Sequence, residues 1–388
     1  MYYISSVDND LYGITDTLDG VEEFYSYNDV MYILSLGLEV KGASLSSVEL
    51  YNPDRDMMKM KLAGLLEDFY ITKEGSNFIL KAYNGNDKVV NIPDFVTVLD
   101  SNAFEDGKFE YVNIPSSVKT IKLCCFNYCK NLKKIVIPDS VNFVGCDCFR
   151  NCVSLEEVVL SKNLDYIGAN CFRYCTSLKS IKIPDSVTKL DYNCFDSCSS
   201  LTNVKLSKNL KDICGNAFKL CMNLKSIELP NKLEKLYNNC FDSCGIESIN
   251  IPDSVKSIGA GAFAKCINLK KVVIPKGIKV LERNTFHSCS NLKSVIFNDN
   301  LLEIQDECFN GCKNLESLNL PDSLKVLGRC CFQDCIKLTD IVIPDSVDEM
   351  DLYCFAGCKK LESISLSKRT KIFNFNTSNL NVLIKRRK

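Results

Sequence analysis

The chain has 388 residues, of which 46% are hydrophobic and 24% are charged, the balance of an ordinary soluble protein. One globular core rarely grows to this length, whereas a stacked repeat array has no such limit, because each unit is buried against its neighbours. No apolar run approaches the roughly 18–20 residues that a membrane-spanning helix needs, so we expect no membrane span. The segment MYYISSVDNDLYG lacks a basic stretch followed by an apolar core, so we also expect no secretory signal.

The formal net charge of -1 is unevenly distributed. Residues 1–60 contain eleven Asp and Glu against three Lys and Arg, so this segment carries -8 and the rest of the chain +7. A dedicated nucleic-acid-binding protein concentrates its basic residues on one stripe, whereas this excess is thinly spread. We therefore expect no nucleic-acid partner.

The chain contains 23 cysteines, an odd number, so at least one thiol is unpaired in a monomer. Dense cysteine in a short secreted chain indicates a disulfide framework, but this chain is long enough to form its own core. Without an export signal, reduced thiols and a cytoplasmic location are favoured, with the cell surface or secretion as the alternative.

Residues 1–68 contain no copy of the repeat described below, and they predict a small α+β unit. Its elements are expected to be strands at 2–7, 11–17 and 21–26, a helix at 27–36, a return strand at 38–41 and a weaker helix at 56–66. This unit acts either as a cap on the first repeat or as an acidic docking module. Residues 69–93 predict a strand pair leading into the array, with a turn at Gly75-Ser76.

The rest of the chain repeats one unit, marked by a Phe at intervals of 22 or 23 residues. The marker stands at Phe104, Phe126, Phe149, Phe172, Phe195, Phe218, Phe241, Phe263, Phe286, Phe309, Phe332 and Phe355. In the two shorter units the missing residue lies between the Phe and the next apolar position, occupied by Phe109 and Ile246. A loss confined to that turn leaves the strand register intact, as a stacked sheet requires.

Each unit contains a strand, two turns and a second apolar pair. In one unit, Val158 and Leu160 are predicted to point inward from the strand, and in the next Pro184 ends the strand and Asp185-Ser186 forms a turn. The segment Asn-Cys-Phe-x-x-Cys is expected to form a helical turn with Cys171 and Cys175 on one face. Units alternate in part between IPDSV and LSKNL, a super-period of 46 residues.

This pattern predicts a mainly β repeat solenoid of about twelve 22–23-residue units over residues 69–372, with the small α+β cap before it. Residues 373–388 are expected to form a cap strand (381–384) and a frayed basic tail. The consensus IPDSV-x-x-IG-x-x-x-F-x-x-C-x-x-L resembles the BspA-type leucine-rich repeats, over roughly residues 90–366. The resemblance implies a continuous parallel sheet and binding of a protein or matrix partner, often at cell surfaces.

The cysteines form a ladder, since Cys stands three residues after the Phe in eleven of the twelve units and just before it in eight. One interpretation is a metal-binding or redox stack of thiolates. The favoured interpretation is core packing, because Ala217, Ala262 and Thr285 replace the first Cys, which a ligand set does not tolerate. Cys124, Cys146, Cys214 and Cys330 lie off the ladder.

No motif predicts catalysis, a cofactor or a metal. The chain has one histidine, His287, in a position that other units fill with Arg, Asp, Lys or Gln, so we expect it to be an exposed surface residue. A row of Asn two residues before the Phe (170, 193, 216, 239 and 284) is interpreted as turn capping, with a sugar- or ion-binding row as the alternative.

The remaining candidate site is the outward surface of the repeated strand. Its predicted partner-binding residues are Lys134, Val136, Val159, Lys182, Lys205, Glu228, Asn250, Val273, Ile296, Asn319 and Val342. The sequence thus predicts a monomeric, non-enzymatic scaffold that binds a protein partner through an extended sheet face. Two alternatives stay open: a cysteine-rich thiol or metal-binding protein, and an array that displays a functional N-terminal domain.

Overall fold

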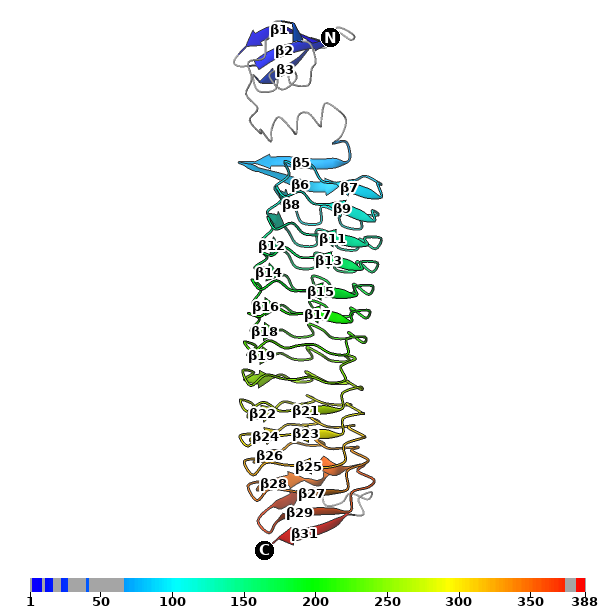
Figure 1. The fold of residues 1–388 in the computed structure, drawn as a ribbon, viewed down its shortest axis with the longest axis vertical. Helices are drawn as coiled ribbons and strands as arrows, with labels where there is room; N and C mark the ends of the chain where they lie inside the picture. The colour runs from blue at the N-terminus through cyan, green and yellow to red at the C-terminus, as the bar shows by residue number, and fades with distance from the viewer. Residues whose placement is uncertain are drawn as a thin grey trace.

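The repeat region is an elongated β-solenoid in which each unit forms one rung (Figure 1). This computed structural model describes residues 66–373 and 382–387, together with four strands in the N-terminal segment. No helix in these described parts is long and apolar enough to cross a membrane.

The four N-terminal strands form a sheet of order β3-β2-β1-β4. They are β1 (Tyr2–Asp8), β2 (Leu11–Asp16), β3 (Glu22–Ser26) and β4 (Val40–Lys41). The four predicted strands are therefore confirmed. The predicted helix at 27–36, and almost all of the one at 56–66, lie outside the described residues, so the α+β assignment and the domain boundaries stay predictions.

A β-hairpin opens the array, as predicted. Strands β5 (Phe69–Glu74) and β6 (Asn77–Tyr83) pair antiparallel around Gly75, whose φ of 62° suits the turn. Strand β6 then pairs in parallel with β8, so the hairpin passes directly into the first rung.

Two columns of short parallel strands run along the solenoid. We call the first the wide sheet. Its strands are β7 (Val89–Asn91), β9 (Tyr111–Asn113), β11 (Lys134–Val136), β13 (Glu157–Val159), β15 (Ser180–Lys182), β17 (Asn203–Lys205), β21 (Lys271–Val273), β23 (Ser294–Ile296), β25 (Leu318–Asn319), β27 (Asp340–Val342), β29 (Ser363–Ser367) and β31 (Leu383–Arg387).

We call the second column the narrow sheet. Its first strand is β6. The strands after it are β8 (Val98–Leu99), β10 (Thr120–Ile121), β12 (Phe143–Val144), β14 (Tyr166–Ile167), β16 (Lys189–Leu190), β18 (Asp212–Ile213), β19 (Lys235–Leu236), β20 (Ser257–Ile258), β22 (Val280–Leu281), β24 (Glu303–Ile304), β26 (Val326–Leu327), β28 (Glu349–Asp351) and β30 (Lys371–Phe373). Among the described residues the one helical element is a 3₁₀ turn, η1 (Leu352–Phe355).

Alternation of side chains decides which residues form the core. In β13, Val158 is buried between the exposed Glu157 and Val159, because successive side chains in a strand point to opposite faces. The marker Phe rings stack through the interior, each on the next, with centroids 4.9 to 5.8 Å apart and planes within 9°. The core is thus a continuous column shared by all rungs.

The two shorter units keep the strand register, as predicted. Tyr111 pairs with Val89 across the first short unit, and Ser257 pairs with Lys235 across the second. In the second unit the shorter turn brings Gly245 so close to its neighbour that a Cβ would lie 2.1 Å from the Met222 carbonyl oxygen. Only glycine fits there.

Except at Phe355, where η1 forms a 3₁₀ turn, the segment around the marker Phe does not form the predicted helical turn. Asn170 and Tyr174, two residues either side of Phe172, have φ of 57° and 62°, a left-handed conformation that interrupts an α-helix. The turn is stabilised instead by the next rung, since the N–H groups of Asn170, Phe172 and Tyr174 donate to its carbonyls at 2.8 to 2.9 Å. Asn tolerates this conformation better than most residues, which explains the Asn row.

The IPDSV and LSKNL segments of successive rungs form hydrogen bonds with each other. The Asp139 carboxylate accepts the Lys162 backbone N–H at 2.9 Å and its ammonium at 3.0 Å, while Asn163 donates to the Asp139 carbonyl at 2.8 Å. Asp185 and Lys208 repeat the backbone contact at 2.9 Å. The super-period of 46 residues therefore reflects an Asp-Ser rung paired with a Lys-Asn rung.

The C-terminal basic residues are part of the sheet, so the predicted frayed tail is wrong there. Strand β31 pairs in parallel with β29 from Leu383 to Arg387. The Arg386 guanidinium donates to three backbone carbonyls, and that of Arg387 pairs with Asp345. These contacts anchor the segment over the last rung.

Candidate binding surface

The eleven residues predicted to bind a partner lie on the outward side of one face. Nine of them lie in strands of the wide sheet, and Glu228 and Asn250 lie on the two rungs between β17 and β21. All eleven side chains are exposed, from 43% for Val159 to 56% for Val342 among the valines. The structure therefore brings these residues together as one surface.

Apolar residues of this surface are in direct register. Val136 pairs with Val159, and Val273 pairs with Ile296, on adjacent strands. Because neighbouring parallel strands lie about 4.8 Å apart, each pair forms a small flat apolar area that faces solvent. Val342, at the other end, pairs with Asn319.

Most charged side chains next to this surface are neutralised by ion pairs between rungs. Lys134 and Glu157 lie 2.9 Å apart, and Lys179 and Glu156 lie 2.5 Å apart. Such exposed pairs contribute little to stability, roughly 0–1 kcal/mol each. They do leave this part of the face with little net charge.

Lys182 and Lys205 are an exception. They are directly paired in the ladder between β15 and β17, so two ammonium groups share one column of the sheet. Among the described residues neither side chain has an ion pair or a hydrogen bond. Like charges in register destabilise a sheet, so fold stability does not explain this pair.

The wide sheet is interrupted next to these lysines. It consists of three hydrogen-bonded parts, β7 to β17, β21 with β23, and β25 to β31. Within the described chain no backbone hydrogen bond joins Asn203–Lys205 to Ser226–Glu228. The predicted continuous sheet is therefore wrong at these breaks, although the Phe column continues beneath the first, with the Phe195 and Phe218 rings 5.4 Å apart.

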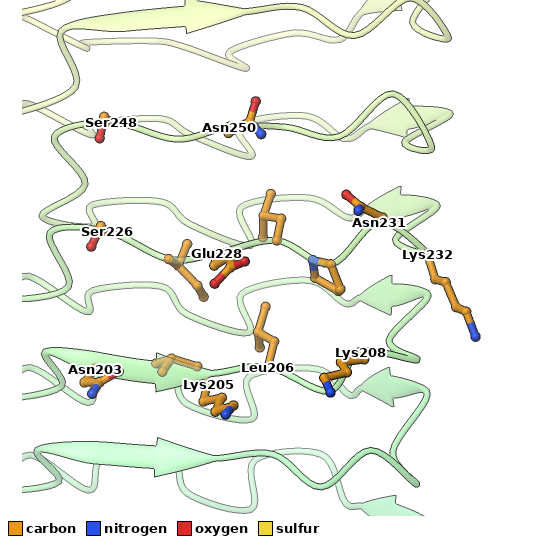
Figure 2. Close-up of a pocket in the computed structure, with 14 residues that line it drawn as sticks. Asn203, Lys205, Leu206, Lys208, Ser226, Glu228, Asn231, Lys232, Ser248 and Asn250 are labelled. Carbon is orange, nitrogen blue, oxygen red and sulfur yellow. The ribbon is translucent and has the colours of Figure 1, made fainter.

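A groove of about 870 Å³ lies at the first break (Figure 2). Its polar lining includes Lys205, Lys208 and Lys232, with Glu228 as the one acidic residue. Lys208, Lys232 and the groove itself were not predicted from the sequence. The 23-residue spacing of Phe195, Phe218 and Phe241 runs through the break, so the period of the repeat does not mark it.

The position one residue after the Phe is more buried than predicted. Asp196 is 3% exposed and Asp242 is 6% exposed, and the His287 side chain is 28% exposed. The prediction of an exposed slot is therefore wrong. Side chains at this position lie between rungs and can form ion pairs with each other. Arg173 and Asp196, for example, lie 2.9 Å apart.

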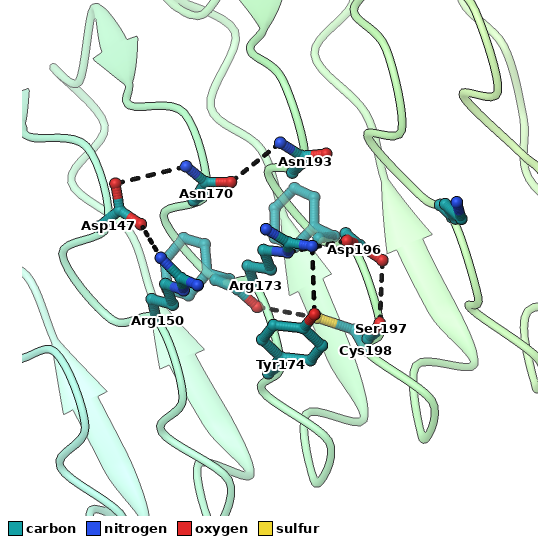
Figure 3. Close-up of polar contacts among 12 residues, drawn as sticks. Asp147, Arg150, Asn170, Arg173, Tyr174, Asn193, Asp196, Ser197 and Cys198 are labelled. Carbon is teal, nitrogen blue, oxygen red and sulfur yellow. Dashed lines mark hydrogen bonds and ion pairs between the residues drawn. The ribbon is translucent and has the colours of Figure 1, made fainter.

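Arg150 and Arg173 extend this arrangement into a polar network (Figure 3). Asp147 accepts from Arg150 at 3.1 Å and from Asn170 at 3.3 Å. Asn193 donates to Asn170 at 2.9 Å, so the Asn side chains form a ladder along the turns. The side chains of Asn170 and Asn193 are thus used within the fold, and all five Asn of the row have a left-handed backbone, which supports the turn-capping interpretation.

The thiols three residues after the Phe also form a ladder. Each donates to the carbonyl of the Phe one rung earlier, at 2.8 to 3.4 Å, in all eleven units that have it. Burial raises the pKa of Cys289 to about 12 and holds that of Cys198 well above its usual range. A buried thiol that keeps its proton is a poor metal ligand.

These observations support the core-packing interpretation of the cysteines. In residues 66–373 and 382–387, no three His, Cys, Asp or Glu side chains are grouped so as to hold a metal ion. The 23 cysteines are all free in this structure. The cytoplasmic location expected from the sequence stays a prediction.

Solved structures share this architecture. A leucine-rich repeat protein from Bacteroides ovatus is 26% identical, with a TM-score of 0.66, over 82% of this chain and 98% of that chain. A leucine rich cell surface protein from Faecalibacterium prausnitzii is 23% identical, with a TM-score of 0.53, over 89% and 96%. The similarity to the Faecalibacterium prausnitzii protein is one of fold alone. A search of curated proteins found no match to the chain.

The sequence itself matches a family model. Residues 97–222, 189–316 and 279–384 each match the "BspA type Leucine rich repeat region (6 copies)". The three segments overlap and together extend from residue 97 to residue 384, well over half of the chain. The protein therefore belongs to the BspA-type leucine-rich-repeat family.

Proposed function

We propose that the protein is a non-enzymatic scaffold that binds another protein through the outward surface of the wide sheet. The observation that carries this proposal is the set of exposed, in-register apolar residues, with Val136 46% and Val273 47% exposed. A water-soluble sheet face normally carries polar side chains outward, so exposed branched residues in ordered rows suit contact with a partner. Extended repeat surfaces are what proteins of this architecture bind with.

The mechanism is recognition by a preorganised surface. The Phe column and the ladders of thiols and Asn hold the rungs in place, so little conformational entropy is lost on binding. Many shallow contacts along several rungs then add up to affinity, and no bond is made or broken.

The test is capture of a partner from native extract, followed by measurement of its affinity for variants of the scaffold. The variant Val136→Ser/Val273→Ser removes apolar contacts from the wide sheet. The matched control is Leu302→Ser/Val326→Ser near or in the narrow sheet, where Val326 has the same 46% exposure as Val136. We expect the first variant to weaken binding at least about tenfold and the control to bind like the wild type.

Equal affinity of the wild type and the wide-sheet variant would show that the partner binds elsewhere. Circular dichroism spectra of both variants verify that neither change disturbs the solenoid.

A further inference from the structure

We propose that the groove at the first break of the wide sheet, together with Lys182, is a docking site for an acidic, extended peptide segment of the partner. This inference deepens the proposed function and rests on it, because it assigns a chemistry to one part of the same face.

The lysines of this cluster carry positive charge that no ion pair balances. Lys182 and Lys205 are paired in register, and the Lys208 side chain has no ion pair or hydrogen bond among the described residues either. On the same face, by contrast, Lys134 and Lys270 have glutamate partners at 2.9 and 3.1 Å. These three lysine side chains therefore lack ion-pair partners, and Glu228 is the one acidic residue that lines the groove beside them.

The backbone at the break is also unpaired. Strand β17 ends the first part of the wide sheet, and its edge makes no ladder with Ser226–Glu228 in the described structure. The unpaired N–H and C=O groups at the break can form hydrogen bonds with single backbone amides of a peptide that crosses the rungs. A peptide that crosses the break provides both donors and acceptors.

Glu228 favours a peptide over a uniform polyanion. Glu228 is the one acidic residue of the groove, and it lies on the rung next to Lys205 (Figure 2). A sulfated glycan presents negative charge along its whole length and is repelled at Glu228. A peptide places acidic side chains on the lysines and an N–H group or a neutral residue at Glu228.

The size of the site agrees with a short peptide segment. The groove spans three rungs, from Asn203 to Asn250, and Lys182 adds a fourth. At about 4.8 Å between rungs, four rungs extend over roughly 15 Å. An extended chain covers that distance with about five residues.

The experiment uses the full chain and three fluorescent probes at about 0.1 M salt. The probes are a ten-residue peptide of alternating Glu and Ser, the same peptide with Gln for Glu, and a heparin-derived decasaccharide. We expect the wild type to bind the Glu peptide at least about tenfold more tightly than the Gln peptide or the decasaccharide.

Two matched variants locate the site. Lys182→Gln/Lys205→Gln is expected to weaken binding of the Glu peptide at least about tenfold, whereas Lys279→Gln/Lys325→Gln, an equal loss of charge at exposed lysines by the narrow sheet, changes it less than about twofold. Glu228→Gln is expected to raise affinity for the decasaccharide. The melting temperature of Lys182→Gln/Lys205→Gln should be unchanged or higher, because like-charge repulsion is removed.

Three results would overturn the inference: an equal loss in both lysine variants, tighter binding of the decasaccharide than of the Glu peptide by the wild type, or no binding of either probe. None of them bears on the valine substitutions of the proposed function. A partner that needs Val136 and Val273 but ignores Lys182 and Lys205 would leave the scaffold proposal intact and reject the acidic peptide.

Discussion

At the scale of single residues, hydrogen bonds between rungs explain the composition of the repeat better than surface chemistry does. Cysteine recurs after the Phe because its thiol is small enough to be buried and still donates to the Phe carbonyl of the previous rung. Asparagine recurs before the Phe because the backbone there is left-handed. Cys124 and Cys330, which lie off the ladder, have φ of 54° and 56° at that same left-handed position.

The thiol ladder predicts a measurable cost for losing one rung of it. In Cys198→Ala the donor to the Phe172 carbonyl, at 3.1 Å, is lost and a small cavity remains. We expect the free energy of unfolding to fall by about 1–2 kcal/mol, measured by urea denaturation in reducing buffer.

The control for this prediction is Cys330→Ala. Cys330 is only half-buried and makes no ladder bond, so its loss is expected to cost about 0.5 kcal/mol or less. Equal losses for the two variants would mean that neither burial of the Cys198 thiol nor its hydrogen bond to the Phe172 carbonyl stabilises the rungs.

At the scale of elements, the ends of the stack need protection, because a terminal rung exposes an apolar face and an unpaired strand edge. Hairpin β5–β6 covers one end of the described array, and β31 pairs along β29 near the other. The basic side chains of β31 contribute through contacts with backbone carbonyls and Asp345.

Deletion of residues 382–388 tests this role. The edge of β29 then loses its partner strand, and we expect concentration-dependent self-association of the chain, visible by light scattering after size-exclusion chromatography. Replacement of Lys385 by Ala in the full chain serves as the control and should leave the elution unchanged. A truncated chain that elutes as one species at all concentrations would show that β31 is not needed to protect the edge.

At the scale of the whole molecule, stability is expected to follow the stack. Each rung contacts its neighbours, so the free energy of unfolding is approximately a sum of rung terms and nearest-neighbour terms. The stacked Phe rings contribute to the nearest-neighbour terms of every rung from Phe104 to Phe355. The loss of free energy of unfolding when one ring is removed therefore depends on where that ring lies in the column.

The variants Phe218→Ala and Phe355→Ala test this dependence. Phe218 stacks on two rings, at 5.4 Å each, whereas Phe355 stacks on Phe332 alone, at 5.8 Å. We expect Phe218→Ala to cost about 3–5 kcal/mol and to divide unfolding into two transitions, and Phe355→Ala to cost less and to loosen only the end. Urea denaturation and amide hydrogen exchange measure both effects, and one shared transition in both variants would contradict nearest-neighbour coupling.

The residues of the proposed site could be placed on one face from the sequence, because strand alternation and a 22–23-residue period together determine which side chains share a column. This reasoning correctly selected Val136, Val159 and Val273 as exposed residues of one face. The same reasoning correctly predicted that the strand register continues across both short units. The exposed face and the strand register both follow from the periodicity of the repeat, which can be read directly from the sequence.

Other features were decided by contacts between rungs, which the repeat does not encode. The left-handed turns at Asn170 and Tyr174 are stabilised by carbonyls 22 residues further along, so the sequence around Phe172 was misread as helical. The pairing of β31 with β29 uses partners some 20 residues earlier in the chain, so a basic tail was misread as frayed. Burial of Asp196 depends on Arg173 in the rung before it.

By itself, the sequence of this protein determined the family, the stacked architecture, the buried Phe column and the face on which valines and lysines are displayed, because each depends on a pattern that recurs in every unit. Only the tertiary structure decided where the wide sheet breaks, and therefore that Lys205, Lys208, Lys232 and Glu228 line one groove. The break depends on how neighbouring rungs hydrogen-bond, and the 23-residue spacing of the Phe residues is the same on both sides of it.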